Sequence, residues 1–130
     1  MLDDLSAAHE QIDEWESALR DRVTKATELA NRTASLTGSA RDRDGLAEVT
    51  VDSTGSMTQL WLSERVRHQS AAATAELVMT TMLAAQSQLA QRMNAEAAAA
   101  YGPHSAATAA IIANVERRFG QSLDGDDAAR

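Results

Sequence analysis

Arginine and lysine side chains are the residues of this sequence best suited to a chemical role, because their cationic groups bind phosphate oxygens. Arg22, Lys25 and Arg32 project within about 80° of one another if their segment is a helix that turns about 100° per residue. One helical face can therefore follow a row of phosphates. Six other cations are further candidates for phosphate binding, namely Arg20, Arg41, Arg43, Arg65, Arg67 and Arg92.

The helical cations also have a structural interpretation, since an acid placed four residues before a base stabilises an exposed helix. Three such pairs occur, namely Glu16 with Arg20, Asp21 with Lys25, and Glu28 with Arg32. For the four arginines that flank a turn or follow a predicted strand, the corresponding interpretation is ordinary solvation. The residue types and spacings leave phosphate binding and these alternatives open.

Residues for catalysis or metal binding are scarce. The sequence has no cysteine, and His9, His68 and His104 lie in separate segments without helical or strand spacing. Neither a phosphate-binding glycine loop nor a dinucleotide-binding glycine motif occurs. Asp42-x-Asp44-Gly45 resembles the start of a calcium loop, but Glu48 comes too early to close it. We therefore expect a protein that is not an enzyme and uses no metal or cofactor.

The composition predicts a thin hydrophobic core in a single domain. Of 130 residues 44% are hydrophobic, but 27 are alanines, which gain little from burial, and only four are aromatic. This scarcity of large apolar side chains predicts self-association. The formal net charge is −7, no apolar run is long enough to cross a membrane, and Met1-Leu2-Asp3-Asp4 is unlike a secretory signal. We expect a cytoplasmic protein without a membrane partner.

Apolar residues repeat every seven positions over residues 3–36, which predicts a long helix with a coiled-coil-like stripe. One series is Leu5, Ile12, Leu19, Ala26 and Thr33, and the other is Ala8, Trp15, Arg22, Leu29 and Leu36. Trp15 lies on this stripe, which favours a packing role for its side chain. Arg22 and Thr33 interrupt the stripe, so looser packing is expected in the second half.

A small antiparallel sheet is predicted over residues 37–66. Ala47, Val49 and Val51 alternate with polar residues, as expected for a strand with one wet face. Gly55 follows in a turn, residues 57–62 form the returning strand, and residues 37–43 are a candidate third strand.

The rest of the sequence predicts two helices, over residues 70–101 and 104–119, separated by Gly102-Pro103. Their apolar stripes are Val78, Met82, Ala85 and Leu89 in the first, and Ala107, Ile111, Val115 and Phe119 in the second. Residues 121–130 are predicted to be a disordered acidic tail. The chain is thus expected to form one α+β domain over residues 1–120, whose one-faced sheet would be completed by a second copy across a twofold axis.

The middle of the sequence resembles the YbaB/EbfC family over about residues 3–100. The resemblance rests on Gly45-Leu46-Ala47-Glu48-Val49-Thr50-Val51-Asp52, Gly55, Leu60-Trp61-Leu62, Ala75-Glu76-Leu77 and Ala84-Ala85. It implies a homodimeric, nucleoid-associated protein of the bacterial cytoplasm that binds double-stranded DNA through backbone and shape, with tweezer-like helical arms. The cations that correspond to the family's DNA contacts are Arg20, Arg22, Lys25, Arg32 and Arg92.

Three features depart from the family's pattern. They are the charge of −7, the segment Ala73-Thr74-Ala75-Glu76 in place of a proline-acid helix start, and the added helix after Pro103. The negative charge opposes long-range attraction to DNA. The alanine-rich ending resembles that of actinobacterial members linked with type VII secretion loci. A dimeric protein-interaction module, with weak or no DNA binding, is therefore the alternative to the DNA-binding dimer.

Overall fold

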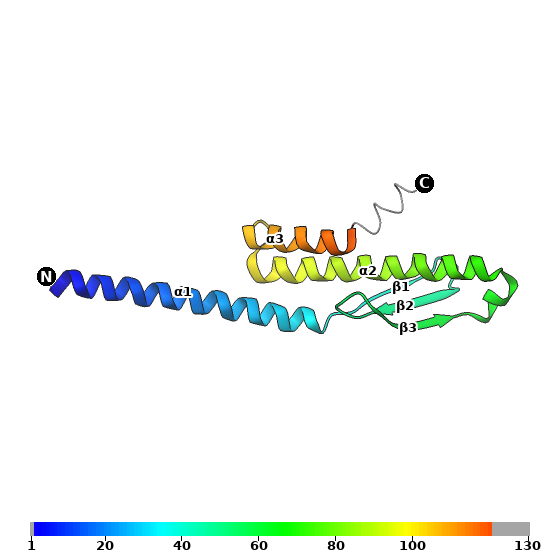
Figure 1. Cartoon of the computed structure of the whole chain (residues 1–130), viewed down its shortest axis with the longest axis horizontal. Coiled ribbons are helices and arrows are strands. Elements are labelled where there is room, and N and C mark those ends of the chain that lie inside the picture. Colours follow the sequence, from blue (N-terminus) through cyan, green and yellow to red (C-terminus); the bar gives the residue numbers. More distant parts are fainter. Residues whose placement is uncertain (1, 121–130) are drawn as a thin grey trace.

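The computed structural model describes residues 2–120, and its elements follow the predicted order of helix, sheet, long helix and short helix (Figure 1). They are α1 (Leu2–Ala34), β1 (Gly38–Arg41), β2 (Ala47–Val51), β3 (Met57–Leu62), a 3-10 helix η1 (Glu64–His68), α2 (Ala71–Tyr101), α3 (Ala106–Val115) and a π-helical turn η2 (Glu116–Gly120). The α+β class is confirmed, and the candidate third strand is present as β1. The predicted acidic tail lies outside the described residues.

The three strands form an antiparallel meander in the order β1-β2-β3. Val49 pairs with Ala40 on one side and with Leu60 on the other. The side chains of Ala47, Val49 and Val51 are fully buried, because α2 lies across β1 and β2. The face of β2 predicted to be apolar is therefore the one that α2 covers.

The β2–β3 turn is organised by Asp52. Its carboxylate Oδ1 accepts hydrogen bonds from the Thr54 hydroxyl at 2.6 Å, from the Thr54 backbone N–H at 2.9 Å and from the Ser56 backbone N–H at 3.1 Å. These bonds, with the Thr54 hydroxyl contributing most, hold the pKa of Asp52 below its ordinary value. Gly55 completes the turn with a φ of +85°, a conformation that favours glycine.

Small residues let α2 approach the sheet closely. Thr81, Ala85, Leu89, Met93 and Ala97 are its buried residues, spaced four apart along one face. A Cβ added at Gly38 of β1 would overlap the Ala85 carbonyl oxygen. The predicted stripe is confirmed at Ala85 and Leu89, whereas Val78 and Met82 are only half-buried, with Met82 packed against the edge of the core.

The chain reverses at Gly102, and α3 returns along α2 (Figure 1). Val115 and Phe119 are buried in the same core cluster as Val49 and Leu89. The predicted stripe is wrong at Ala107, which is exposed, because the adjacent Thr108 faces α2 instead. The Thr108 hydroxyl donates to the Gly102 carbonyl at 2.6 Å, so the turn selects a polar residue there. The last predicted turn of this helix is the π-helical η2.

The first helix is mostly outside this core. Its C-terminal part contacts α2, where Leu29 is buried, while its N-terminal half extends past the ends of α2 and α3 (Figure 1). The predicted helix is present, but the stripe residues Leu5, Ile12, Trp15 and Leu19 are exposed. The expected packing role of Trp15 is therefore wrong within a single chain.

Candidate nucleic-acid interface

Three of the predicted phosphate ligands, Arg22, Lys25 and Arg32, lie on the exposed surface of α1. Within residues 2–120 their side chains form no hydrogen bond or ion pair. Of the three predicted helix pairs, only Glu16–Arg20 is formed, with 3.9 Å between Glu16 Oε2 and Arg20 Nη2. The ion-pair interpretation therefore fails for Lys25 and Arg32 in this geometry, and both cations are available to a ligand.

Charge is divided unevenly along α1. Residues 3–16 contain six carboxylates and no lysine or arginine, whereas all four cations of the helix lie between Arg20 and Arg32. Residues 17–120 contain eleven lysines and arginines against ten acids. The net charge of −7 therefore comes from the projecting end of α1 and from residues 121–130, and the rest of the chain is close to neutral.

A second group of cations gathers at the far end of the sheet. Arg41 and Arg43 flank the β1–β2 turn, and Arg65 and Arg67 lie on η1 directly after β3. A methyl group added at Gly45 would lie 3.7 Å from Nη2 of both Arg41 and Arg65. The fold thus brings residues from both ends of the β1–β3 segment together within one chain, which the sequence spacing alone did not predict.

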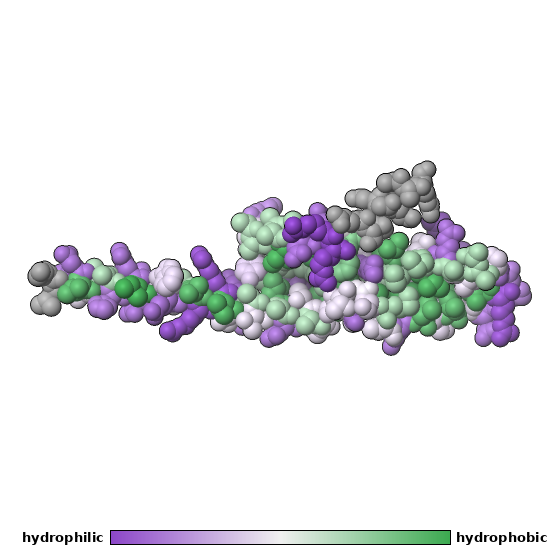
Figure 2. Space-filling model, in the orientation of Figure 1, coloured by the Kyte–Doolittle hydropathy of each residue, from purple (hydrophilic) through white to green (hydrophobic). Residues whose placement is uncertain are grey.

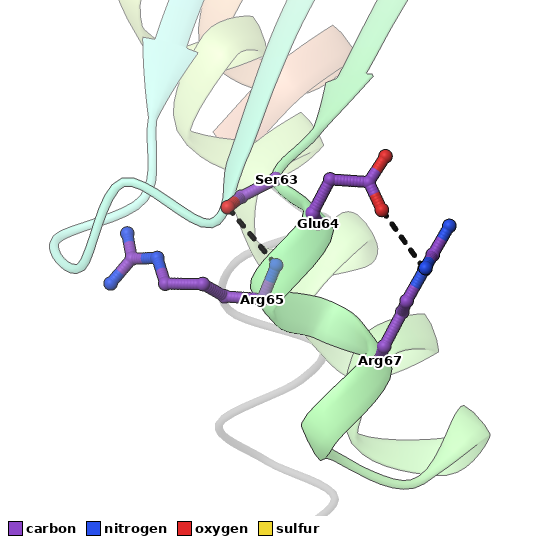
Figure 3. A network of polar contacts seen from close by, with 4 residues as sticks. All are labelled: Ser63, Glu64, Arg65 and Arg67. Atoms are coloured by element: carbon purple, nitrogen blue, oxygen red, sulfur yellow. Dashed lines mark hydrogen bonds and ion pairs between the residues drawn. The ribbon is translucent and has the colours of Figure 1, made fainter.

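Local contacts fix two members of this group (Figure 3). The Arg65 guanidinium donates a 2.7 Å hydrogen bond to the Asp44 carbonyl, which anchors η1 to the β1–β2 turn. Arg67 Nε forms an ion pair with Glu64 Oε2 at 2.9 Å, and Ser63 caps the 3-10 helix by accepting from the Arg65 backbone N–H at 3.2 Å. Exposed pairs of this kind are weak, so Arg67 can be released to a phosphate at little cost.

The side chains of the other two members, Arg41 and Arg43, form no hydrogen bond or ion pair to a described residue. The Arg41 guanidinium lies 5.6 Å from the centre of the Trp61 ring, a cation–π contact on the open face of the sheet. Arg43 lines a hollow of about 400 Å³ between the β1–β2 turn and α2, and it has no hydrogen bond or ion pair to a described residue. The interpretation of ordinary solvation therefore fits Arg43, whereas Arg41 contacts Trp61 and Arg65 contacts the Asp44 carbonyl.

Arg92 has a structural contact that its position in the sequence did not reveal. Its Nη1 donates to the Thr37 carbonyl at 2.6 Å and ties α2 to the α1–β1 connection. Two cations that the sequence did not single out, Arg117 and Arg118, lie on η2. Arg118 lies 5.0 Å from the Phe119 ring centre. In the sequence, Arg117 and Arg118 are marked only by their position beside the apolar stripe of the last helix. That signal is too weak to distinguish them from other surface arginines.

The outer strand β3 is poorly covered, because α2 extends over β1 and β2 only. Leu60 and Leu62 point to the side of the sheet that α2 occupies, yet Leu60 is 45% exposed. Exposed Met79 of α2 adds to the apolar surface of the molecule. A partner that covers this edge would bury apolar side chains and the free hydrogen-bonding groups of β3.

Other kinds of site have no support among residues 2–120. No group of three or more histidine, aspartate and glutamate side chains is arranged to hold a metal ion. None of the helices in this range is long and apolar enough to cross a membrane.

The molecule is thus a small helix–sheet–helix domain with cations exposed on its first helix and at one end of its sheet. The family model of the YbaB/EbfC DNA-binding family matches residues 3–103, which is most of the chain. This chain therefore belongs to the YbaB/EbfC DNA-binding family. Neither a curated protein nor a solved structure matches it. Helix α3 begins beyond the matched residues, although its side chains complete the core.

Proposed function

We propose that this protein is a nucleoid-associated homodimer, without catalytic activity, that binds double-stranded DNA in the bacterial cytoplasm. The match of residues 3–103 to a DNA-binding family carries this proposal. The unpaired cations Arg22, Lys25 and Arg32 support it, because they present positive charge on the exposed surface of the C-terminal half of α1, beside the body. The family match and the exposed cations are consistent with a protein that recognises the phosphates and the shape of DNA more than its base edges.

The energy of such binding comes from displaced counterions. Each phosphate contacted by an arginine or lysine adds about 0.9 to the slope of log affinity against log salt on duplex DNA. The near-neutral balance of residues 17–120 gives little long-range attraction, so local cation groups must provide the contacts. Strong binding is expected at low salt, with a steep fall as the salt concentration rises.

The dimer is inferred from uncovered apolar surface. Exposed Leu60 and Leu62 on β3 and Met79 on α2 lack intramolecular cover, and the sheet has only one face buried. A second copy related by a twofold axis would cover the same surface on both chains. Sedimentation equilibrium at micromolar concentration should give twice the chain mass; a single 13.9 kDa species with native circular dichroism would contradict the dimer.

Two matched triple variants test the DNA contacts. The first replaces Arg22, Lys25 and Arg32 by glutamine, and the second replaces Arg41, Arg43 and Arg67 by glutamine. Both remove three positive charges, so they change the net charge equally. We expect the α1 variant to lower the salt slope on random duplex DNA by about 0.9 for each phosphate that it no longer binds.

Electrophoretic shifts across a salt series distinguish the results. A lower slope in the α1 variant alone assigns the contacts to that helix, and a lower slope in the second variant alone assigns them to the end of the sheet. If both slopes equal that of the wild type, neither group binds phosphate. If the dimeric wild type gives no shift even at low salt, DNA binding is wrong for this chain.

The second candidate function is a dimeric protein-interaction module, for example an accessory protein linked to type VII secretion. The observation that favours it is the projecting half of α1, which is acidic and apolar and so is suited to a protein surface rather than to DNA. It becomes the better proposal if the low-salt shift is absent.

A further inference from the structure

Trp61 is an exposed aromatic side chain on the face of the sheet that α2 does not cover. It pairs across the strands with Glu48, which in turn pairs with Arg41, so the three side chains point to this open face. Trp61 is 48% exposed, although the Arg41 guanidinium lies over its ring. The ring takes no part in the core beneath α2, so its role must be sought outside the chain.

The ring borders a hollow of about 600 Å³ on the outer strands of the sheet, which is lined by Glu48, Thr50, Thr58, Gln59, Leu60 and Trp61. The Glu48 carboxylate and the Gln59 amide form no side-chain hydrogen bond or ion pair to a described residue. They are therefore available to a ligand. A hollow with an aromatic wall and free hydrogen-bonding groups fits a planar, polar ring such as a nucleobase.

Two guanidinium groups converge beside Gly45, and one of them is the Arg41 group that lies over Trp61. Figure 2 shows hydrophilic atoms at this end of the molecule, where η1 lies in Figure 1. Because a methyl group at Gly45 would lie 3.7 Å from Nη2 of both Arg41 and Arg65, the glycine leaves a space that both groups border. Neither guanidinium forms an ion pair with a described carboxylate. Both can therefore donate to the oxygens of one phosphate.

The acids around these groups give the surface a direction. In the β1–β2 turn, the Asp42 carboxylate accepts from the Asp44 backbone N–H at 3.1 Å, and the Asp44 side chain is exposed without an ion pair to a described residue. Glu48 instead stands beside the Trp61 ring. A carboxylate repels a phosphate but accepts hydrogen bonds from the N–H groups of a base. A nucleotide is therefore favoured with its phosphate at Gly45 and its base at Trp61.

We propose that the open face of the sheet binds a nucleotide of an unpaired DNA strand, with the base stacked on Trp61 and the phosphate held between Arg41 and Arg65. A base inside a duplex is stacked on its neighbours and cannot reach the ring, so the ligand is single-stranded. The match to a DNA-binding family selects DNA as the strand. This activity goes beyond the proposed binding of duplex DNA, which depends on phosphates and shape.

The site is separate from the other surfaces of the molecule. The cations proposed to contact duplex DNA on α1 belong to another element. Exposed Leu60 and Leu62, from which the dimer is inferred, point to the opposite side of β3 from Trp61. A dimer built on those leucines can therefore form while the Trp61 ring stays accessible. Failure of the stacking site leaves the proposed binding of duplex DNA untouched, and loss of duplex binding leaves the stacking site in place.

Tryptophan fluorescence tests the stacking directly. The chain has two tryptophans, so a Trp15→Phe variant leaves Trp61 as the only reporter. The probes are an oligothymidylate of about 12 nucleotides and a strand of equal length and charge made of abasic sites. We expect the oligothymidylate to quench the emission and to bind about tenfold more tightly than the abasic strand, because only it has a base to stack. Equal quenching by both strands, or none by either, would overturn the proposal.

Two matched arginine variants test the phosphate contact. Arg41→Gln and Arg67→Gln each remove one charge from the same end of the sheet, but Arg67 extends away from Arg65 and pairs with Glu64 (Figure 3). Measured by the anisotropy of a labelled oligothymidylate, Arg41→Gln should weaken binding about tenfold and Arg67→Gln no more than about twofold. Equal losses would mean that the charges act only at long range, and would overturn the assignment of Arg41.

Two further measurements complete the test. Trp61→Leu should remove the preference for oligothymidylate over the abasic strand while the remaining affinity keeps its salt dependence. Circular dichroism establishes that each variant retains the fold, which is expected because these side chains are exposed. A preference that survives in Trp61→Leu would place the base elsewhere. An oligouridylate that binds more tightly than oligothymidylate would assign the site to RNA and overturn the choice of DNA.

Discussion

The two long helices have nearly equal lengths, 33 residues in α1 and 31 in α2, but opposite surroundings. Large apolar residues such as Leu5, Ile12 and Trp15 are exposed along α1. Along α2 the buried positions include two alanines, Ala85 and Ala97, and a threonine. Burial in this molecule therefore does not follow the hydrophobicity of the side chains.

The difference follows from the size of the side chains that α2 presents to its neighbours. Alanine at position 85 lets the backbone of Gly38 come close enough for Leu89 to pack on the sheet. A helix of bulky residues would be held further away. The bulky stripe along the first half of α1 stays exposed instead.

The largest expected effect is destabilisation of the core between β2 and α2. Val49→Asp places an unpaired charge on the fully buried face of β2 beneath α2. We expect a loss of about 4 kcal/mol or more in the free energy of unfolding and a fall of at least about 10 °C in Tm. Thermal circular dichroism measures it.

Gln59→Asp on the exposed β3 is the matched control for Val49→Asp, and it should cost no more than about 1 kcal/mol. An unchanged Tm for Val49→Asp would show that β2 presents its other face to α2.

Leucine truncation compares the two helices directly. Leu89→Ala in α2 removes a fully buried side chain and should lower the free energy of unfolding by about 2 to 5 kcal/mol. Leu19→Ala in α1 should cost less than about 0.5 kcal/mol in a single copy, because that side chain is exposed. Urea unfolding at several protein concentrations measures both.

Concentration dependence sharpens this comparison. If α1 pairs with a second copy, the cost of Leu19→Ala should grow with protein concentration. Equal costs for the two variants at every concentration would contradict the contrast between the helices.

The smallest expected effect concerns the contact between η2 and the β2–β3 turn. A Cβ at Gly55 would lie 2.8 Å from Phe119 Cε1, in a residue whose φ is +85°. Gly45→Ala has a φ of +69° but no atom closer than 3.7 Å, so it includes the backbone strain without the clash. We expect Gly55→Ala to cost about 1 kcal/mol more than Gly45→Ala in thermal unfolding.

Replacing Phe119 by leucine should reduce that difference, because the two sites share the contact. If the difference stays the same in the Phe119→Leu background, the clash is not its cause, and the packing of η2 against the turn is weaker than the structure indicates.

Much of the fold was predictable because its signals are local. The alternation at Ala47, Val49 and Val51 indicated the buried face of β2, and Gly55 indicated the turn that follows it. The seven-residue repeat indicated the length of α1. At Thr108, by contrast, a polar residue is buried where the apolar pattern favoured Ala107, because two backbone carbonyls of the preceding turn and helix lie within reach of its hydroxyl.

The candidate site was predicted in residue type but not in arrangement. Lys25 and Arg32 were recognised as cations on one helix face, yet their freedom from Asp21 and Glu28 is a matter of side-chain geometry. Arg92 looked equivalent to them in the sequence and instead holds the Thr37 carbonyl. Contacts of this kind join residues more than fifty positions apart, so no local pattern contains them.

The sequence by itself determined the order of the elements, the apolar face of β2, the stripe along α1 and the uneven charge of that helix. These properties depend on backbone periodicity and residue type, which act over a few neighbouring positions. Only the tertiary structure decided which apolar faces are covered, because α2 and α3 pack together over the sheet while the first half of α1 extends away from the other described elements. Burial depends on where distant segments meet, and that is fixed by the packing of the whole domain.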